Sequence, residues 1–166
     1  MSSGKVAAII PAAGSGERLS APENKPFLLL GNIPVVVHTL QKFQDCSEVR
    51  EVVVVVRGVD LQRVADLVSK YQFTKVVEIV EGGERRQDSV YRGLQSILKR
   101  DVEHVLVHDA VRPFVHVEKI REIIRACQEH DAAVLAIRPK DTIKLSNGSP
   151  FVQTTLDRSN LWAGQT

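Results

Sequence analysis

The stretch AAIIPAAGSGERLSAPENKPF, residues 7–27, decides the fold of this chain. It begins as an apolar run, passes into a loop with Gly14 and Gly16, and then carries Arg18 and Lys25. A continuous apolar run is typical of a strand covered on both faces, as in a parallel sheet. Small loop residues let backbone N–H groups approach a ligand. Backbone donors next to mobile cations favour a phosphate-rich ligand, although glycines alone are equally typical of a plain strand-to-helix turn.

Similar apolar runs recur along the chain and alternate with segments of helical spacing. The further runs cover residues 51–56, 75–80, 104–109 and 132–137. Apolar residues at helical spacing occur in residues 61–71, 89–100 and 117–130. Strands that alternate with helices predict an α/β fold with a doubly wound, mostly parallel, Rossmann-like sheet.

The pattern changes after Pro139. The segment TIKLSNGSPFVQTTL, residues 142–156, alternates polar and apolar residues around Asn147-Gly148. This pattern predicts a β-hairpin that protrudes from the main sheet. We expect one domain over residues 1–166, with residues 139–158 as an arm used for dimerisation.

Composition narrows the class of protein. Charged residues make up 25% of the 166 residues and the formal charge is +2, which argues against general binding to nucleic acid or membranes. No signal-peptide core follows the start MSSGK, and no apolar run is long enough to span a membrane. Cys46 and Cys127 lack metal-ligand spacing and are expected to be free thiols. We therefore expect a cytoplasmic protein that binds neither nucleic acid nor membranes.

In open α/β sheets, ligands bind beyond the carboxyl ends of the strands, so the loops there matter most. After the third run, Gly82-Gly83 form a second loop for close approach, and Asp88-Ser89 begin a helix, where either residue also suits a helix cap. After the fourth run comes HDAVRP, residues 108–113. Asp109 could hold Mg²⁺ or a hydroxyl there, or simply pair with Arg112. His108 is expected to be structural.

Other chemistries find little support in the sequence. The first loop lacks the Gly-Lys-Ser/Thr ending of a Walker A motif, and Leu19 occupies the place of the third glycine in a GxGxxG fingerprint. A dinucleotide-dependent dehydrogenase is therefore a weak alternative. No nucleophile elbow or zinc motif is present.

Six blocks in order resemble 2-C-methyl-D-erythritol 4-phosphate cytidylyltransferases of the non-mevalonate isoprenoid pathway. The blocks are PAAGSGERL, KPFLLLGNIPVVVHTL, EGGERRQDSVYRGL, VLVHDAVRPFV, DTIKL and TTLDRSNLWAGQT. The resemblance implies a homodimeric enzyme that uses CTP and Mg²⁺ to convert a sugar-alcohol phosphate to a CDP-alcohol and pyrophosphate.

The resemblance also implies roles for individual residues. Arg18 and Lys25 would stabilise the transition state. The loop around the triphosphate would comprise Pro11, Ala12, Ala13, Gly14 and Gly16. The residues that recognise cytosine and ribose would be Gly83, Glu84 and Ser89, with Asp109 and Ala110 also at the nucleotide. The metal ligand would be Asp109, and the acceptor would meet Asp109, Arg112, Thr142, Arg158 and Thr166. Arg158 would be a third catalytic residue, and in this family the corresponding arginine acts across the dimer interface.

The chain departs from the family at its end. Family members continue beyond the position of Thr166 with a Pro-Gln segment, a helix, a strand and a lysine near the acceptor. We therefore expect part of the sheet and acceptor site to be missing from this chain, apolar surface to be exposed, and activity to depend on the missing part. Two alternatives stay open: a cytidylyltransferase for another acceptor, such as ribitol 5-phosphate, and a non-catalytic nucleotide-binding module.

Overall fold

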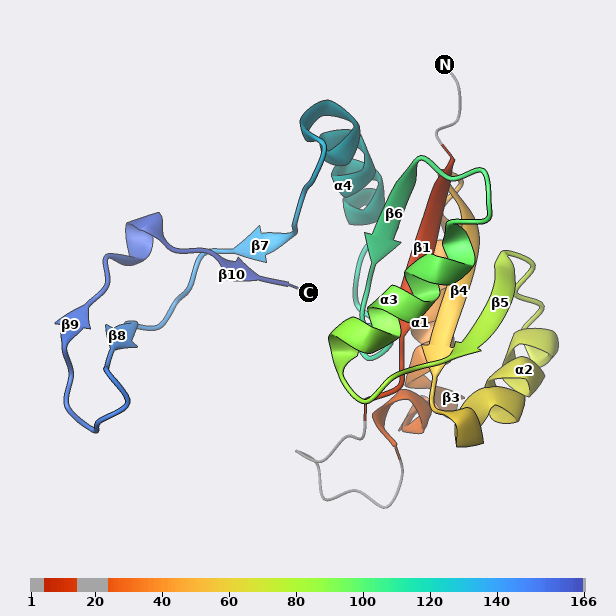
Figure 1. Cartoon of the computed structure of the whole chain (residues 1–166), viewed down its shortest axis with the longest axis horizontal. Coiled ribbons are helices and arrows are strands. Elements are labelled where there is room, and N and C mark those ends of the chain that lie inside the picture. The colour runs from red at the N-terminus through yellow and green to blue at the C-terminus, as the bar shows by residue number, and fades with distance from the viewer. Residues whose placement is uncertain (1–4, 15–23, 166) are drawn as a thin grey trace.

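A parallel sheet with the strand order β5-β4-β1-β6 forms the centre of the molecule (Figure 1). The structure is a computed structural model and describes residues 5–14 and 24–165. The strands are β1 (Val6–Pro11), β4 (Val49–Val56), β5 (Val76–Glu81) and β6 (His104–Val107). They confirm the first four predicted strands and the α/β class. Within the described ranges, no helix is long and apolar enough to cross a membrane.

Four helices cover the two faces of this sheet (Figure 1). They are α1 (Val35–Asp45), α2 (Leu61–Lys70), α3 (Arg86–Ile97) and α4 (Val117–His130). The helical spacing correctly predicted α2, α3 and α4. Shorter elements are η1 (Lys25–Phe27), β2 (Leu29–Leu30), β3 (Ile33–Pro34) and η2 (Gly58–Asp60).

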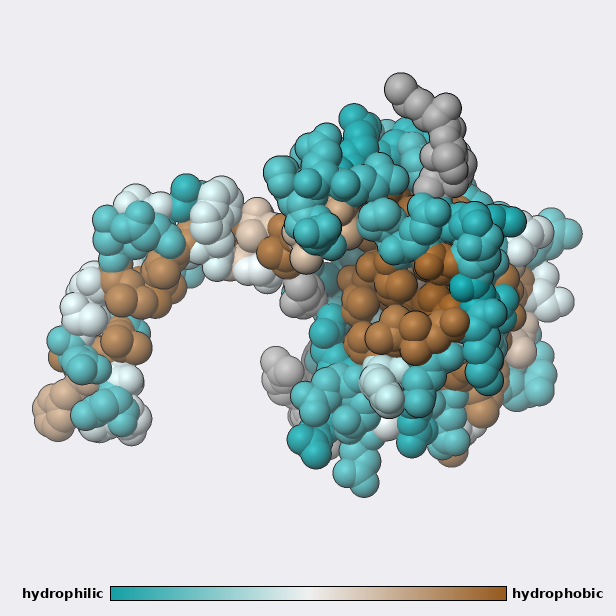
Figure 2. Space-filling model, turned by 45° about the horizontal axis from the view of Figure 1, so that its top comes forward, coloured by the Kyte–Doolittle hydropathy of each residue, from teal (hydrophilic) through white to brown (hydrophobic). Residues whose placement is uncertain are grey.

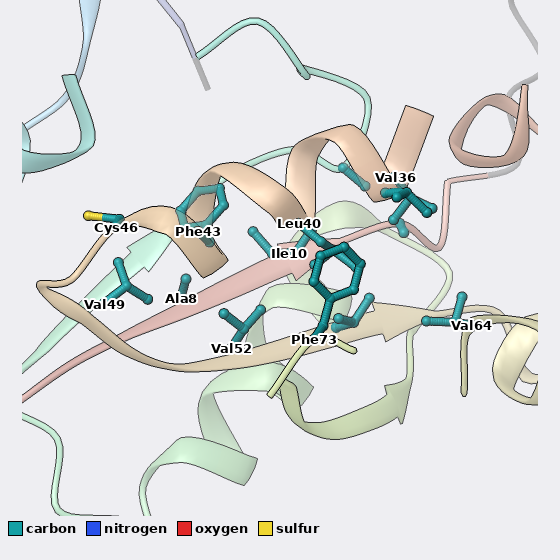
Figure 3. Close-up of a cluster of buried hydrophobic side chains, with 14 of the residues drawn as sticks. Ala8, Ile10, Val36, Leu40, Phe43, Cys46, Val49, Val52, Val64 and Phe73 are labelled. Carbon is teal, nitrogen blue, oxygen red and sulfur yellow. The ribbon is translucent and has the colours of Figure 1, made fainter. Parts of the chain in front are cut away.

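Alternate residues of the buried strands supply two separate cores. Ala8 and Ile10 of β1 face α1, α2 and α4, where Leu40 and Phe43 complete the larger cluster (Figure 3). Ala7 and Ile9 face the other side, where Ile97 of α3 packs. Because both faces are covered, β1 needs apolar residues at every position, which explains its continuous apolar run.

The fifth predicted strand is the main correction to the fold. Residues 132–137 were expected in the parallel sheet, but only β7 (Ala136–Ile137) is extended, and it pairs antiparallel with β10 (Ala163–Gly164) in a separate sheet. Asp131, with a φ of 62°, turns the chain after α4. The Leu135 carbonyl then accepts a hydrogen bond from the backbone N–H of Gln165 (2.7 Å). An apolar run indicates a tendency to be buried, but it does not specify the partner strand.

The predicted hairpin is present on an arm that extends away from the sheet (Figure 1). Its strands are β8 (Lys144–Leu145) and β9 (Thr154–Thr155), and η3 (Arg158–Asn160) follows. Gly148 has a φ of 90°, a conformation that favours glycine and explains the Asn-Gly signal. The two strands are short, so the loop between them is longer than a tight two-residue turn.

Gly93 tests how closely α3 approaches the sheet. A Cβ at this position would lie 2.7 Å from Ile9 Cγ2 and 3.0 Å from Val55 Cγ2. Although alanine favours a helix by about 1 kcal/mol, we expect Gly93→Ala to lower the free energy of unfolding by about 1–2 kcal/mol through overpacking. Urea unfolding measures this change. The exposed position Gln95 of α3 provides the control, because Gln95→Ala should be neutral. Equal stability of the two variants would contradict the close packing.

Candidate functional site

A cavity of about 400 Å³ opens at the carboxyl ends of β1, β5 and β6. This is where the sheet topology places ligands. Its lining residues are Pro11, Ala12, Ala13, Gly14, Lys25, Pro26, Gly83, Glu84, Arg85, Arg86, Ser89, Asp109 and Val111. The structure therefore brings together most of the site residues predicted from sequence, from four segments that are far apart in the chain.

The loop after β1 supplies one wall of the cavity. The backbone N–H of Ala12 donates to the Val55 carbonyl (2.7 Å), which ties the start of the loop to β4. Gly14 has open space around it, since an added Cβ would meet no atom within 4 Å. Gly14 is thus not required by packing against the described residues, and its lack of a side chain leaves room for a ligand. Gly16 and Arg18 lie outside the described residues.

The second glycine loop is required by packing as well as by ligand access. A Cβ at Gly82 would lie 2.5 Å from Ala13 Cβ and 2.7 Å from Ser89 Oγ, and one at Gly83 would lie 2.4 Å from Asp88 Cβ. These distances are too short for any side chain. The loop is glycine-rich because it is squeezed between the first loop and the start of α3.

Neither Asp88 nor Ser89 is the N-cap of α3, because the helix begins at Arg86 and Arg85 is its N-cap. Both residues nevertheless have structural roles. Asp88 Oδ2 accepts a hydrogen bond from the backbone N–H of Arg85 (3.2 Å), just before α3. Ser89 is 2% exposed, and its Oγ accepts a hydrogen bond from the backbone N–H of Gly83 (3.2 Å). Ser89 therefore shapes the glycine loop from within, while still lining the cavity.

Asp109 lies between two guanidinium groups. Arg86 Nη2 and Nε both donate to Asp109 Oδ1, at 2.8 and 3.0 Å, and Arg112 Nε lies 3.4 Å from Oδ2. The expected Asp109–Arg112 pair is thus present. Arg86 was missed by the sequence analysis, although its place in the first turn of a helix beside the glycine loop was a usable signal. Paired guanidinium groups keep this carboxylate oriented toward the cavity.

Cations dominate the mouth of the cavity. Lys25, Arg85 and Arg86 all line it, against the carboxylates of Glu84 and Asp109. Lys25 belongs to η1, which is anchored by the buried ring of Phe27. The Arg63 guanidinium of α2 lies over that ring, 4.0 Å from its centroid. The packing of Phe27 therefore fixes where the backbone of Lys25 lies.

Some predicted site residues lie away from the cavity. Ala110 is 1% exposed and does not line it. Thr142 and Arg158 are exposed on the arm or at its end, where Arg158 Nη1 donates to the Lys140 carbonyl (2.9 Å). Arg112 lies beside the cavity and donates to Gln165 Oε1 (3.2 Å). Thr166 lies outside the described residues.

His108 is structural, as predicted. Its ring packs against Phe43, with centroids 5.2 Å apart, and Nε2 donates to the Arg112 carbonyl (3.0 Å). Burial lowers the pKa of His108 below its ordinary value of 6.5. The neutral imidazole thus holds the 108–112 loop closed beside Asp109.

This burial predicts a pH dependence of stability. The folded state resists protonation of His108, whereas the unfolded state binds a proton as the pH falls through 6.5. The free energy of unfolding should therefore be highest above pH 6.5 and fall below it, by at most about 1.4 kcal/mol per pH unit. Urea unfolding at several pH values checks this. His108→Gln should reduce the slope, and His130→Gln, at an exposed histidine, should leave it. An unchanged slope in His108→Gln would contradict the assignment.

Comparison with known proteins finds matches to the family that the sequence motifs resemble. The family model IspD: 2-C-methyl-D-erythritol 4-phosphate cytidylyltransferase matches residues 6–166. A relative of that name from Geobacillus kaustophilus is 44% identical over 159 residues, which are 96% of this chain and 68% of the relative. One from Syntrophus aciditrophicus is 40% identical over 163 residues, covering 98% of this chain and 69% of the relative.

Solved structures agree. The crystal structure of 4-diphosphocytidyl-2C-methyl-D-erythritol synthase from Anaerococcus prevotii has a TM-score of 0.84 and 30% identity, and the match covers 99% of this chain and 69% of that chain. The 2-C-methyl-D-erythritol 4-phosphate cytidylyltransferase of Francisella tularensis has a TM-score of 0.74 at 32% identity, over 98% of this chain and 70% of that chain. The ordered motifs, the fold and these relatives together show that the chain belongs to the 2-C-methyl-D-erythritol 4-phosphate cytidylyltransferase family.

Proposed function

We propose that this protein transfers the cytidylyl group of CTP to 2-C-methyl-D-erythritol 4-phosphate, in the synthesis of isoprenoid precursors. The observation that carries the proposal is the convergence of two glycine loops and three cations on one cavity, in a chain of this family. A phosphate oxygen of the acceptor attacks the α-phosphorus of CTP. The bond from that phosphorus to the bridging oxygen breaks, and pyrophosphate leaves with the electron pair.

Each of the two glycine loops would bind a different part of the nucleotide. Backbone N–H groups of Ala13, Gly14 and Gly16 in the first loop would hold the triphosphate, and Pro11 and Ala12 line the same wall of the cavity. Gly83, Glu84 and Ser89 would receive cytosine and ribose. The hydrogen bond from the Gly83 N–H to Ser89 Oγ supports this assignment, because it fixes the second loop before a ligand binds. A preformed loop loses less entropy when the nucleotide binds.

The cations act where negative charge grows. The acceptor is a phosphate monoester, so its oxygen is already nucleophilic and no strong base is required. Attack places charge on the oxygens of the α-phosphate, and Lys25 and Arg18 would stabilise that charge more in the transition state than in the ground state. Bringing two anions into line against their repulsion is the main task of the site.

Asp109 is the residue that would hold Mg²⁺. Among the described residues no three His, Cys, Asp or Glu side chains form a metal cluster. Mg²⁺ is often held by one or two carboxylates together with phosphate oxygens, so the carboxylate of Asp109 in the cavity fits that requirement. When bound, the ion would neutralise charge on the triphosphate. Arg86 and Arg112 hold the carboxylate in place through their contacts with it.

The acceptor site would be completed by a second copy of the chain. Arg112 lies beside the cavity and contacts Asp109, whereas Thr142 and Arg158 are exposed on the arm, far along the chain from it. The arm also exposes Phe151 by 78% and Val152 by 57%, and apolar side chains gather along it in Figure 2. Exposed apolar side chains of this size are typical of an interface. We infer a homodimer in which the arm of one copy carries Arg158 toward the cavity of the other.

The assay that tests this function is pyrophosphate release from CTP and Mg²⁺, with 2-C-methyl-D-erythritol 4-phosphate and ribitol 5-phosphate supplied separately. The assay is run on this chain and on one extended to the full length of the family. We expect release with the first acceptor alone, because residues 6–166 match the methylerythritol family. Release with ribitol 5-phosphate alone would reassign the acceptor. CTP binding without release in either case would support a non-catalytic nucleotide-binding module.

Lys25→Ala separates transition-state stabilisation from binding. We expect kcat to fall about 100-fold while the KM for CTP changes less than about threefold, because the charge that Lys25 meets develops during the reaction. Lys99→Ala removes the same charge from an exposed site beyond α3 and should leave both constants unchanged. A rise in KM with an unchanged kcat would show that Lys25 only clamps the ground state.

A further inference from the structure

Thr39 is a polar residue in an apolar setting. It is fully buried, at 0% exposure, on α1. The other buried residues of this helix are Val36, Val37, Leu40 and Phe43, all of which are apolar. Valine has the shape of threonine without its hydroxyl, and burying a hydroxyl that lacks a partner destabilises a protein. The hydroxyl therefore needs a strong hydrogen bond to be stable at this position.

That hydrogen bond goes to the loop after β6. Thr39 Oγ1 donates to the Ala110 carbonyl at 2.7 Å, a shorter distance than the 3.3 Å to the carbonyl of Val35 in its own helix. The backbone N–H of Ala110 donates to the Pro11 carbonyl at 3.2 Å. The backbone of Ala110 is thus hydrogen-bonded through its N–H to the end of β1 and through its carbonyl to α1.

Both hydrogen bonds of Ala110 also restrain the residue before it, Asp109. Asp109 precedes it directly, lines the cavity and is gripped by Arg86 and Arg112. Thr39 does not line the cavity itself. We propose that Thr39 is a positioning residue, which sets the affinity of the cavity for a metal-bound nucleoside triphosphate by holding the Asp109–Ala110 backbone in place. This inference rests on the proposed function for the identity of the ligand.

The physical basis is the cost of an unpaired carbonyl. Without the hydroxyl, the Ala110 carbonyl would remain buried among apolar groups with no donor from α1. The backbone would then relax to find another donor, and the carboxylate of Asp109 would move with it. Small displacements of this kind weaken a site because its groups must meet the ligand together.

Three variants isolate the hydroxyl. Thr39→Val keeps the shape and removes the donor, and Thr39→Ser keeps the donor. Thr74→Val makes the same chemical change at an exposed hydroxyl, which accepts from Gln44 Nε2 (2.9 Å) far from the cavity. If Thr39→Val folds poorly, Thr39→Cys retains a weak donor of similar size. Circular dichroism and urea unfolding establish the folded fraction of each.

The first readout is the dissociation constant for CTP with Mg²⁺, measured by titration calorimetry without an acceptor. We expect Thr39→Val to raise it about tenfold, the loss typical of a group that supports a ligating residue. Thr39→Ser should stay within about twofold of the unchanged protein, as should Thr74→Val. An unchanged dissociation constant in folded Thr39→Val would overturn the proposal, because a purely structural role lowers only the amount of folded protein.

The second readout needs no ligand. Amide hydrogen exchange of Ala110, followed by NMR, reports whether the backbone opens locally. In Thr39→Val it should speed up more than exchange in β1 and β4, and Thr39→Ser should restore it. Equal acceleration everywhere would mean a global loss of stability and would also overturn the proposal. If the unchanged protein fails to turn over substrate, the proposed function fails, but this readout still decides whether Thr39 holds the loop.

Discussion

The parallel pairing of β1 with both β4 and β6 is the constraint on which the site depends. Pro11 pairs with Val55 and Ile9 with Val107, so these strands end near the same level. The ladder continues into the loops, where the Pro11 carbonyl accepts the N–H of Ala110. The pairing of Glu81 at the end of β5 with Val56 of β4 brings the second glycine loop to the same edge as the first loop and the Asp109 loop. The cavity results from strand register rather than from any single motif.

Local features of the sequence predicted most of the fold. Four strands, three helices and the hairpin follow from periodicity and turn residues within short windows. Helix α1 was not predicted, because its first residues, Val35, Val36 and Val37, are β-branched and suggest a strand. Its burial against the larger core overrides that tendency. The strand expected at residues 132–137 does not join the parallel sheet, because its partner is β10, which follows the arm in the chain.

The sequence predicted many of the residues of the site, but it did not predict the long-range contacts between them. The rule that ligands lie beyond strand carboxyl ends identified the loops that carry Ser89 and Asp109, the glycine loop pointed to Lys25, and the resemblance added an expected role for each. The contact between Arg86 and Asp109 joins residues 23 apart, and that between Thr39 and Ala110 joins residues 71 apart. Neither can be deduced from spacing, because each depends on how a helix is rotated against the sheet.

Contacts that hold the arm and contacts that span the sheet have different consequences for the structure. The shape of the arm is held by contacts among its own residues and those at its base, such as Arg138 stacked 3.8 Å from the ring centroid of Trp162 and Lys144 Nζ hydrogen-bonded to Thr155 Oγ1. Such contacts define a hairpin without a core, so its apolar side chains stay exposed. The cavity, in contrast, is fixed by long-range contacts that need the whole sheet. This contrast supports the proposed homodimer, in which the exposed arm of one copy would carry Arg158 to the cavity of the other.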